Sequence, residues 1–262
     1  MVSVARKNLL AEKTRLFTSV SGVAFSILLI IFLMGVYNAF SELSTAYIDN
    51  IDADIIVGQE GVTDMFHTFS VLGTKKISQV ERVSGGDAYG LVSRAGGVLV
   101  TEEDGSKIVD YPGRPKGENV IGDKEIVNIV GFDTKTTGMG GPWVMISGSD
   151  SPGKREIVVD KVFAGQTGLS IGDQIEAYDE VFTIVGITDK NNMMVYTRAF
   201  VDLGEAQDIL KEKDTVNFIL VKLPDPSQAS EVVERLEREI SGISAFTNSD
   251  FAISNGKMIN ES

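Results

Sequence analysis

The chain has 262 residues, of which 43% are hydrophobic, and a formal net charge of −13 at pH 7. This hydrophobic content excludes an intrinsically disordered protein, and the acidity excludes a nucleic-acid partner, which needs a basic surface to neutralise phosphates. The chain contains no cysteine, which excludes structural disulfides, zinc–thiolate sites, a thiol nucleophile and a lipidated N-terminal cysteine.

A long apolar segment near the N-terminus predicts a transmembrane helix. Residues 16–40 contain no Asp, Glu, Lys or Arg, and a helix of this length extends over roughly 37 Å, which exceeds the hydrocarbon core of a bilayer. The segment is too long for the apolar region of a cleaved signal peptide and lacks the polar face of a soluble helix. We therefore predict an uncleaved signal anchor.

The charges around this segment predict its orientation. Arg6, Lys7, Lys13 and Arg15 precede it, and no Lys or Arg follows it before Lys75. Basic residues stay on the cytoplasmic side of a membrane. We expect residues 1–15 to form a cytoplasmic basic segment, either an amphipathic helix on the inner membrane surface or a solvated tail. The bulk of the chain would then be periplasmic or extracellular, anchored in a bacterial inner membrane.

Residues 41–101 carry signals for strands and one helix. The strand signals are apolar runs, and the helix signals are a capping threonine and a glycine pair that stops the helix. In chain order the pattern predicts a strand at 54–58, an irregular loop at 61–69 that returns close to the membrane, a helix from Thr74 to Gly85, and short strands at 89–93 and 97–101.

Residues 102–195 have a different composition, with frequent glycine and proline between short apolar runs. Such punctuation is typical of turns between strands. The pattern predicts an inserted, mostly β lobe with strands at 126–132, 156–159 and 182–187.

Residues 196–250 return to strands and helices. A capping box at Asp202–Glu205 begins a helix, and an apolar strand follows at 217–223. Asp225 and Pro226 begin an amphipathic helix with an i, i+3, i+4, i+7 apolar stripe, which ends at Gly242. A closing strand is predicted at 243–247.

These elements predict an α+β protein: one N-terminal transmembrane helix followed by an extracytoplasmic domain of two lobes. Residues 41–101 and 196–250 pair as a membrane-proximal split βαβ lobe, residues 102–195 form the inserted lobe, and residues 251–262 are a tail. Both ends of the domain would lie near the membrane, which suits an insertion between two transmembrane helices.

The candidate motifs for chemistry are weak. Gly148–Arg155 resembles a phosphate-binding loop, but Arg155 replaces the Ser or Thr that binds magnesium, and a β-rich run follows instead of a helix. We interpret it as a polar surface turn.

Histidine and aspartate residues offer no complete site either. His67 is the only histidine, with Asp64 nearby, and Asp49, Asp52 and Asp54 lack the glycine and distal glutamate of a calcium loop. We predict no catalytic residue, no cofactor-binding residue and no metal site.

Two methionine-rich loops remain open to two interpretations. Met139 with Trp143, and Met193 with Met194, would contact a partner or lipid if exposed and would fill the core if buried.

One region resembles a known family. The strand–helix–glycine turn–strand pattern covers 155–164, 168–175 and 182–187. Together with the basic segment around Asn8–Leu10 and the strand at Ala53–Val57, it resembles the periplasmic core domain of MacB/FtsX-like ABC transporter permeases. The opening is nearest to the DevC-like branch, associated with lipid or glycolipid export.

The resemblance implies a non-enzymatic permease subunit that couples a cytoplasmic ABC ATPase to a periplasmic substrate or adaptor protein. It also implies membrane lipid as a partner and a homodimer. Such permeases have three further transmembrane helices, so the resemblance implies that this chain is a truncated permease or the product of a split gene. Two alternatives remain: a free-standing single-pass binding or adaptor protein, and a membrane-anchored hydrolase that uses His67.

The DNA downstream of the Ser262 codon tests the permease interpretation. We expect the reading frame to continue into about three apolar segments of about 20 residues each, because a permease needs them to span the bilayer. Sequencing the source genome checks this. A stop codon with no such segments encoded nearby would favour the single-pass binding protein.

Overall fold

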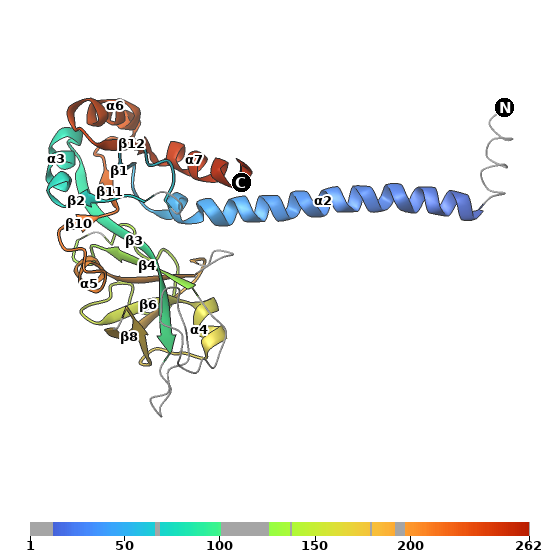
Figure 1. The fold of residues 1–262 in the computed structure, drawn as a ribbon, viewed down its shortest axis with the longest axis horizontal. Coiled ribbons are helices and arrows are strands. Elements are labelled where there is room, and N and C mark those ends of the chain that lie inside the picture. Colours follow the sequence, from blue (N-terminus) through green and yellow to red (C-terminus); the bar gives the residue numbers. More distant parts are fainter. Residues whose placement is uncertain are drawn as a thin grey trace. The chain divides into compact units, whose positions relative to one another are not determined.

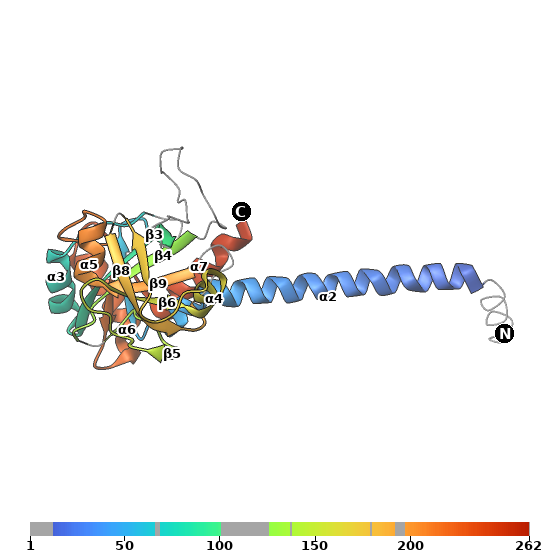
Figure 2. The ribbon, with the colours of Figure 1, turned by 90° about the horizontal axis from the view of Figure 1, so that it is seen from below.

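The computed structural model describes residues 13–65, 69–100, 126–136, 138–178, 180–191 and 197–261. The chain divides into two compact units, residues 1–42 and 43–262. Helix α2 (Lys13–Asn50) makes up the described part of the first unit and continues into the second. Figures 1 and 2 show it as one unbroken helix.

The first unit contains one helical stretch, Phe17–Asn38, that is long and apolar enough to cross a membrane. Its described side chains are exposed, as expected of a surface that faces lipid. Polar side chains within the helix bond back to its own backbone: Thr18 Oγ1 donates to Thr14 O at 3.0 Å and Ser26 Oγ to Gly22 O at 2.9 Å. These bonds lower the cost of placing hydroxyl groups in hydrocarbon.

The second unit begins with a lobe built from two interleaved split βαβ units. Strands β1 (Ile55–Gln59) and β3 (Asp87–Val100) flank β11 (Phe218–Lys222), and helix α3 (Lys75–Ser84) connects them. Strand β12 (Ile243–Thr247) lies on the other side of β1 and is reached from β11 through helix α6 (Ala229–Glu239). The predicted α+β fold class, with an N-terminal apolar helix before a sheet-rich domain, is confirmed.

The helices of this lobe end as the sequence predicts, although their starts differ in detail. Gly85 closes α3 in the left-handed conformation at φ 72°, whereas Thr74 makes no side-chain cap. Asp225 accepts a hydrogen bond from Ser227 N, but the first turn, Pro226–Gln228, is a 3-10 helix that leads into α6.

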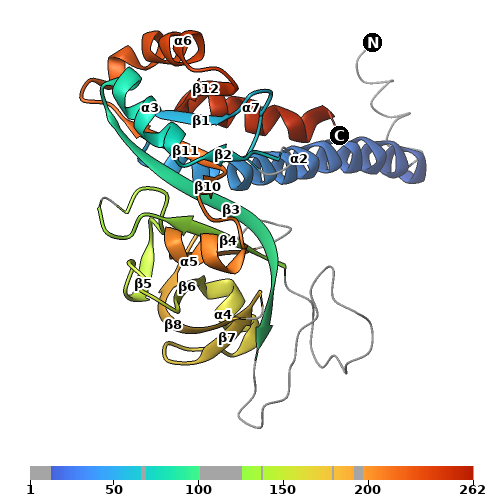
Figure 3. The same ribbon diagram turned by 60° about the vertical axis from the view of Figure 1, so that its left-hand side comes forward.

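The second lobe continues the same sheet, because β3 runs from the first lobe into it (Figure 3). The strand order is β3–β4–β9–β6–β8–β5, and β7 pairs with both β8 and β3, so most of these strands form a closed ring. The elements are β4 (Ile126–Phe132), β5 (Met145–Gly148), β6 (Glu156–Asp160), α4 (Lys161–Thr167), β7 (Gln174–Ala177), β8 (Glu180–Thr188), β9 (Thr197–Asp202) and α5 (Leu203–Ile209). Two short strands, β2 (Leu72–Gly73) and β10 (Thr215–Val216), pair separately.

Three sequence-based expectations are wrong. The short strands predicted at 89–93 and 97–101 are one strand, β3, because residues 92–97 pair continuously with β4. Strand β9 was assigned to the membrane-proximal lobe but pairs with β4 and β6. The expected tail at 251–262 is helical through Glu261, as part of α7 (Asn248–Glu261), because Phe251 and Ala252 can be buried under the sheet. The remaining domain boundaries stay predictions.

Two apolar cores cover opposite sides of the first-lobe sheet. One is covered by α3 and α6. The other lies beneath the end of α2 and the start of α7, and it extends into the second lobe through Phe132, Met139 and Phe200. Met139 is buried and Trp143 packs against the same cluster, so both are core residues; Met193 and Met194 lie outside the described residues.

Helix α7 should contribute to the stability of the domain. Phe251 is fully buried, and Phe251→Ala should lower the free energy of unfolding by about 3–5 kcal/mol because it leaves a cavity. Ile253, on the same helix and 55% exposed, is the matched control, and Ile253→Ala should change it by at most about 0.5 kcal/mol. Urea unfolding of the detergent-solubilised chain, followed by the fluorescence of Trp143, measures both. Equal small losses would mean that α7 is not part of the folded domain.

Candidate functional site

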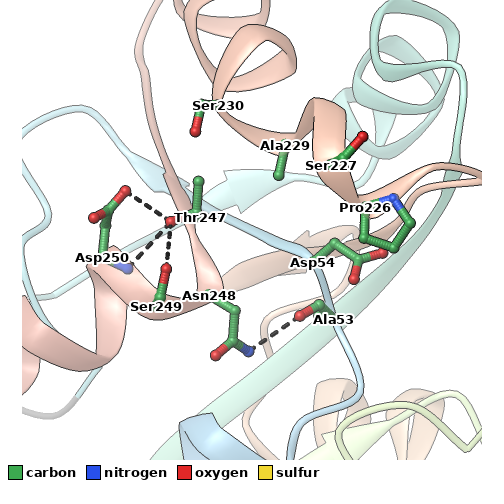
Figure 4. Close-up of a pocket in the computed structure, with 10 residues that line it drawn as sticks. All are labelled: Ala53, Asp54, Pro226, Ser227, Ala229, Ser230, Thr247, Asn248, Ser249 and Asp250. Atoms are coloured by element: carbon green, nitrogen blue, oxygen red, sulfur yellow. Dashed lines mark hydrogen bonds between the residues drawn. The ribbon is translucent and has the colours of Figure 1, made fainter.

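The end of α2, the start of β1 and the start of α7 meet at one place, which we call the junction and define as residues 47–54 and 247–255. Figure 4 shows part of it, where the loop before β1 lies against the first residues of α7. The junction lies where the chain enters the domain from the apolar helix and where α7 leaves the sheet.

Asn248 ties these three segments together. Its Nδ2 donates to Ile48 O at 2.9 Å and to Ala53 O at 3.1 Å, and its backbone N donates to Asp54 O at 3.0 Å. Ile48 O is among the last carbonyls of α2, and it also accepts a longer bond of 3.3 Å from Ile51 N. A side chain 200 positions away in sequence therefore caps the C-terminal end of α2.

Two aspartates bind the same loop to the neighbouring strand. Lys222 Nζ lies 2.7 Å from Asp52 Oδ1 and 3.5 Å from Asp54 Oδ1, and Asp54 Oδ2 accepts from Leu223 N at 2.8 Å. The hydrogen bond that Lys222 Nζ donates to Asp52 is the main cause of a raised pKa for Lys222, which stays protonated at neutral pH. The ammonium of Lys222 thus stands where a calcium ion bridging these two carboxylates would have to bind.

The start of α7 is capped by its own residues. Thr247 Oγ1 donates to Asp250 Oδ2 at 2.7 Å and accepts from Asp250 N at 3.1 Å, so the threonine hydroxyl caps a backbone amide of the first turn (Figure 4). Further along the helix, Asn255 Oδ1 accepts from Met65 N at 3.0 Å and Ser254 Oγ donates to Thr63 O at 2.7 Å. These bonds hold α7 against the loop that follows β1.

A polar cleft of about 490 Å³ lies beside the junction, between the first turn of η1 and α6 and the first turn of α7. Helix N-termini attract anions when their amides are free. Here Asp225 accepts from Ser227 N and Thr247 accepts from Asp250 N, so carboxylate and hydroxyl groups of the chain already occupy both helix starts. The cleft therefore has the chemistry of a structural joint, and we assign it no ligand.

Tyr47 connects the end of α2 to the second lobe. Its hydroxyl donates to Gly140 O at 2.7 Å, and the guanidinium carbon of Arg198 lies 4.4 Å from the centre of its ring. The rings of Trp143 and Phe200 lie 5.9 Å and 6.5 Å from it. Burial raises the pKa of Tyr47, and the charge of Arg198 opposes that shift only in part, so the hydroxyl stays a neutral donor.

The sequence motifs that suggested chemistry do not converge. Gly148–Arg155 joins β5 to strand β6 without a helix, which agrees with the predicted surface turn, and Arg155 pairs with Glu180 at 2.7 Å. His67 lies outside the described residues. Within the ranges that the structure describes, no three His, Asp or Glu side chains are grouped to hold a metal ion.

Three residues that hold the end of α2 were not predicted from the sequence. Asn248, Tyr47 and Arg198 stand alone in sequence, and their partners are long-range. The aromatic Tyr47 just beyond an apolar span was the one available signal, because tyrosine is enriched where such helices leave the membrane.

An apolar helix able to span a membrane, continuous with a two-lobe α+β domain, defines a membrane-anchored protein with its bulk outside the bilayer. The chain belongs to the MacB-like periplasmic core domain family, whose sequence profile matches residues 16–239. The resemblance to MacB/FtsX-like ABC permeases is thereby confirmed.

One solved structure shows the same fold, and a second is reported beside it. The periplasmic region of MacB from Actinobacillus actinomycetemcomitans is 11% identical, with a TM-score of 0.51 over 82% of this chain and 96% of that one. The extracellular domain of the noncanonic ABC-type transporter YknZ from Gram-positive bacteria is 9% identical, with a TM-score of 0.47 over 74% of this chain and 100% of that one. A comparison with curated protein sequences gives no match.

Removing the Asn248 amide should loosen the junction. Asn248→Ala removes the side-chain donor from the carbonyls of Ile48 and Ala53, and the free energy of unfolding should fall by about 1–3 kcal/mol. Asn50 is the matched control: its exposed amide bonds within α2 to Ala46 O, and Asn50→Ala should cost at most about 0.5 kcal/mol. Urea unfolding measures both, and equal losses would contradict the role of Asn248.

Proposed function

We propose that this chain is a permease component of an ABC-type export or mechanotransmission complex, in which it couples a cytoplasmic ATPase to events at the periplasmic domain. The observation that carries the proposal is the junction, where the helix that contains the apolar span is bound to both lobes of the domain. A displacement of the last turn of that helix, at Tyr47 and Ile48, would reach the rest of the domain through packed and hydrogen-bonded groups.

The family supports the first half of this proposal. Membership of the MacB-like periplasmic core domain family links the chain to ABC-type transporter permeases, which act with a cytoplasmic ATPase. The burial of Tyr47 and Ile48 in the last turn of α2, and of Ile51 just after it, supports the second half, because a tightly packed helix end moves with the domain that buries it.

Several finer features belong to the proposal. We place the chain in a bacterial inner membrane with residues 1–15 in the cytoplasm, where that segment can contact an ATPase. A periplasmic adaptor protein, membrane lipid and a second copy of the chain are proposed partners. A lipid or glycolipid is the proposed cargo, which rests on the resemblance of the opening to DevC-like permeases.

The proposal gives the chain no catalytic role of its own. The acidic groups of the junction are engaged with Lys222 and with backbone amides, which leaves them poorly placed as general acids or bases. Hydrolysis of ATP is assigned to the partner subunit. A chain that acts by moving needs two conformational states, and the ATPase must favour one of them over the other.

Recovery of the ATPase from native membranes tests the proposal. Cross-linking in cells, followed by capture of the tagged full-length chain, should recover an ABC ATPase subunit, because the chain needs one to do work. The control is the same chain with Phe17–Asn38 replaced by a cleavable signal sequence, which should recover none.

The purified chain alone should hydrolyse no ATP, and the recovered complex should. Absence of any ATPase subunit from the full-length capture would sink the proposal and leave a single-pass binding protein as the better account. Nucleotide hydrolysis by the chain alone would contradict the non-enzymatic assignment.

A further inference from the structure

The last turns of α2 touch both lobes at once. The carbonyl of Ile48 accepts from Asn248, which begins α7 beside the first-lobe sheet. The preceding residue, Tyr47, turns to the other side and enters the second lobe, against Gly140 and Arg198. Neighbouring residues of one helical turn therefore hold different lobes.

The environment of Tyr47 is closely packed. Gly140 has a φ of +84°, and a Cβ built there would lie 2.7 Å from Leu91 Cδ1 on β3 and 3.1 Å from Leu220 Cδ1 on β11. The loop that accepts the tyrosine hydroxyl thus lies directly on strands of the first lobe. Only glycine fits this backbone conformation and this space.

The charge of Arg198 makes the contact more than apolar packing. Its side chain, on β9, is 1% exposed, and a guanidinium removed from water gains from the negative face of an aromatic ring. Without the ring of Tyr47, the buried charge of Arg198 would be less well stabilised. The second lobe is therefore bound to α2 by a desolvated interaction that water does not readily replace.

We infer that Tyr47 is the positioning residue that keeps the second lobe in register with helix α2, so that a rotation or shift of α2 changes the angle between the two lobes. The inference rests on the proposed function for its purpose, and it adds the route: Tyr47 carries the movement to the second lobe and Asn248 carries it to the first. Strand β3, which passes through both lobes, is the element about which that angle changes.

The distance between the lobes tests this inference without any ATPase. Because the chain contains no cysteine, Glu234→Cys on α6 and Gln166→Cys on α4 introduce two exposed labelling sites, one in each lobe. Spin labels at these positions in the full-length chain, reconstituted in lipid nanodiscs, report the distribution of interlobe distances by electron paramagnetic resonance. The doubly labelled chain with Tyr47 unchanged should give one narrow distribution of interlobe distances.

Tyr47→Leu removes the ring and the hydroxyl and should broaden that distribution about twofold, because the second lobe loses its fixed angle. The matched control is Phe182→Leu: Phe182 is also fully buried and has a guanidinium, that of Arg155, 5.9 Å from its ring centre, but both residues belong to the second lobe. This variant should keep the narrow distribution. A folded Tyr47→Leu chain with an unchanged distribution, or equal broadening in both variants, would overturn the inference.

A milder variant covers the case in which Tyr47→Leu does not fold, which circular dichroism would reveal. Tyr47→Phe keeps the ring on Arg198 and removes only the bond to Gly140 O, so the distribution should broaden by less than twofold but measurably. No broadening in this variant would then overturn the inference. Because no ATPase is present, this result is independent of the capture experiment. If Tyr47 fixes the interlobe distance but no ATPase is captured, the inference stands and only its proposed purpose is lost.

Discussion

The end of helix α2 is buried in the core that both lobes share, and the remaining features of the domain depend on this. Tyr47 and Ile48 lie in the last turn of α2 and Ile51 follows it, and all three side chains are buried in the core of the second unit. The last turn of α2 is therefore packed as part of the domain.

Local patterns in the sequence predicted most of the first lobe. Gly85, Asp225 and Gly242 mark helix boundaries through their own backbone preferences or side-chain caps, so their effect is legible from neighbouring residues. Strands β1 and β11 contain continuous apolar runs, whereas burial alternates along β12, and the split βαβ arrangement followed from the alternation of these strands with helices. The apolar span needed only length and composition.

The errors arise where distant residues decide. Gly96 and Gly97 suggested a break between two strands, but pairing with β4 carries β3 through them. Residues 251–262 were expected to be a tail, and α7 forms because Phe251 packs against Phe218 and Phe246 on the sheet. The contacts of the junction could not be predicted: apart from the position of Tyr47 beyond the apolar span, its asparagine, tyrosine and arginine have no sequence signal until the fold brings their partners together.

The position of β1 in the sheet has a mechanical consequence. It follows α2 directly and is hydrogen-bonded on both sides, to β11 and to β12, so a pull on its first residue loads two ladders together. Strand β12, which leads into α7, ends the sheet and pairs along its length with β1 alone among the described strands. A load applied through α7 would peel one ladder bond by bond. Force that arrives through β1 is therefore shared between two ladders, whereas force that arrives through β12 is carried by one.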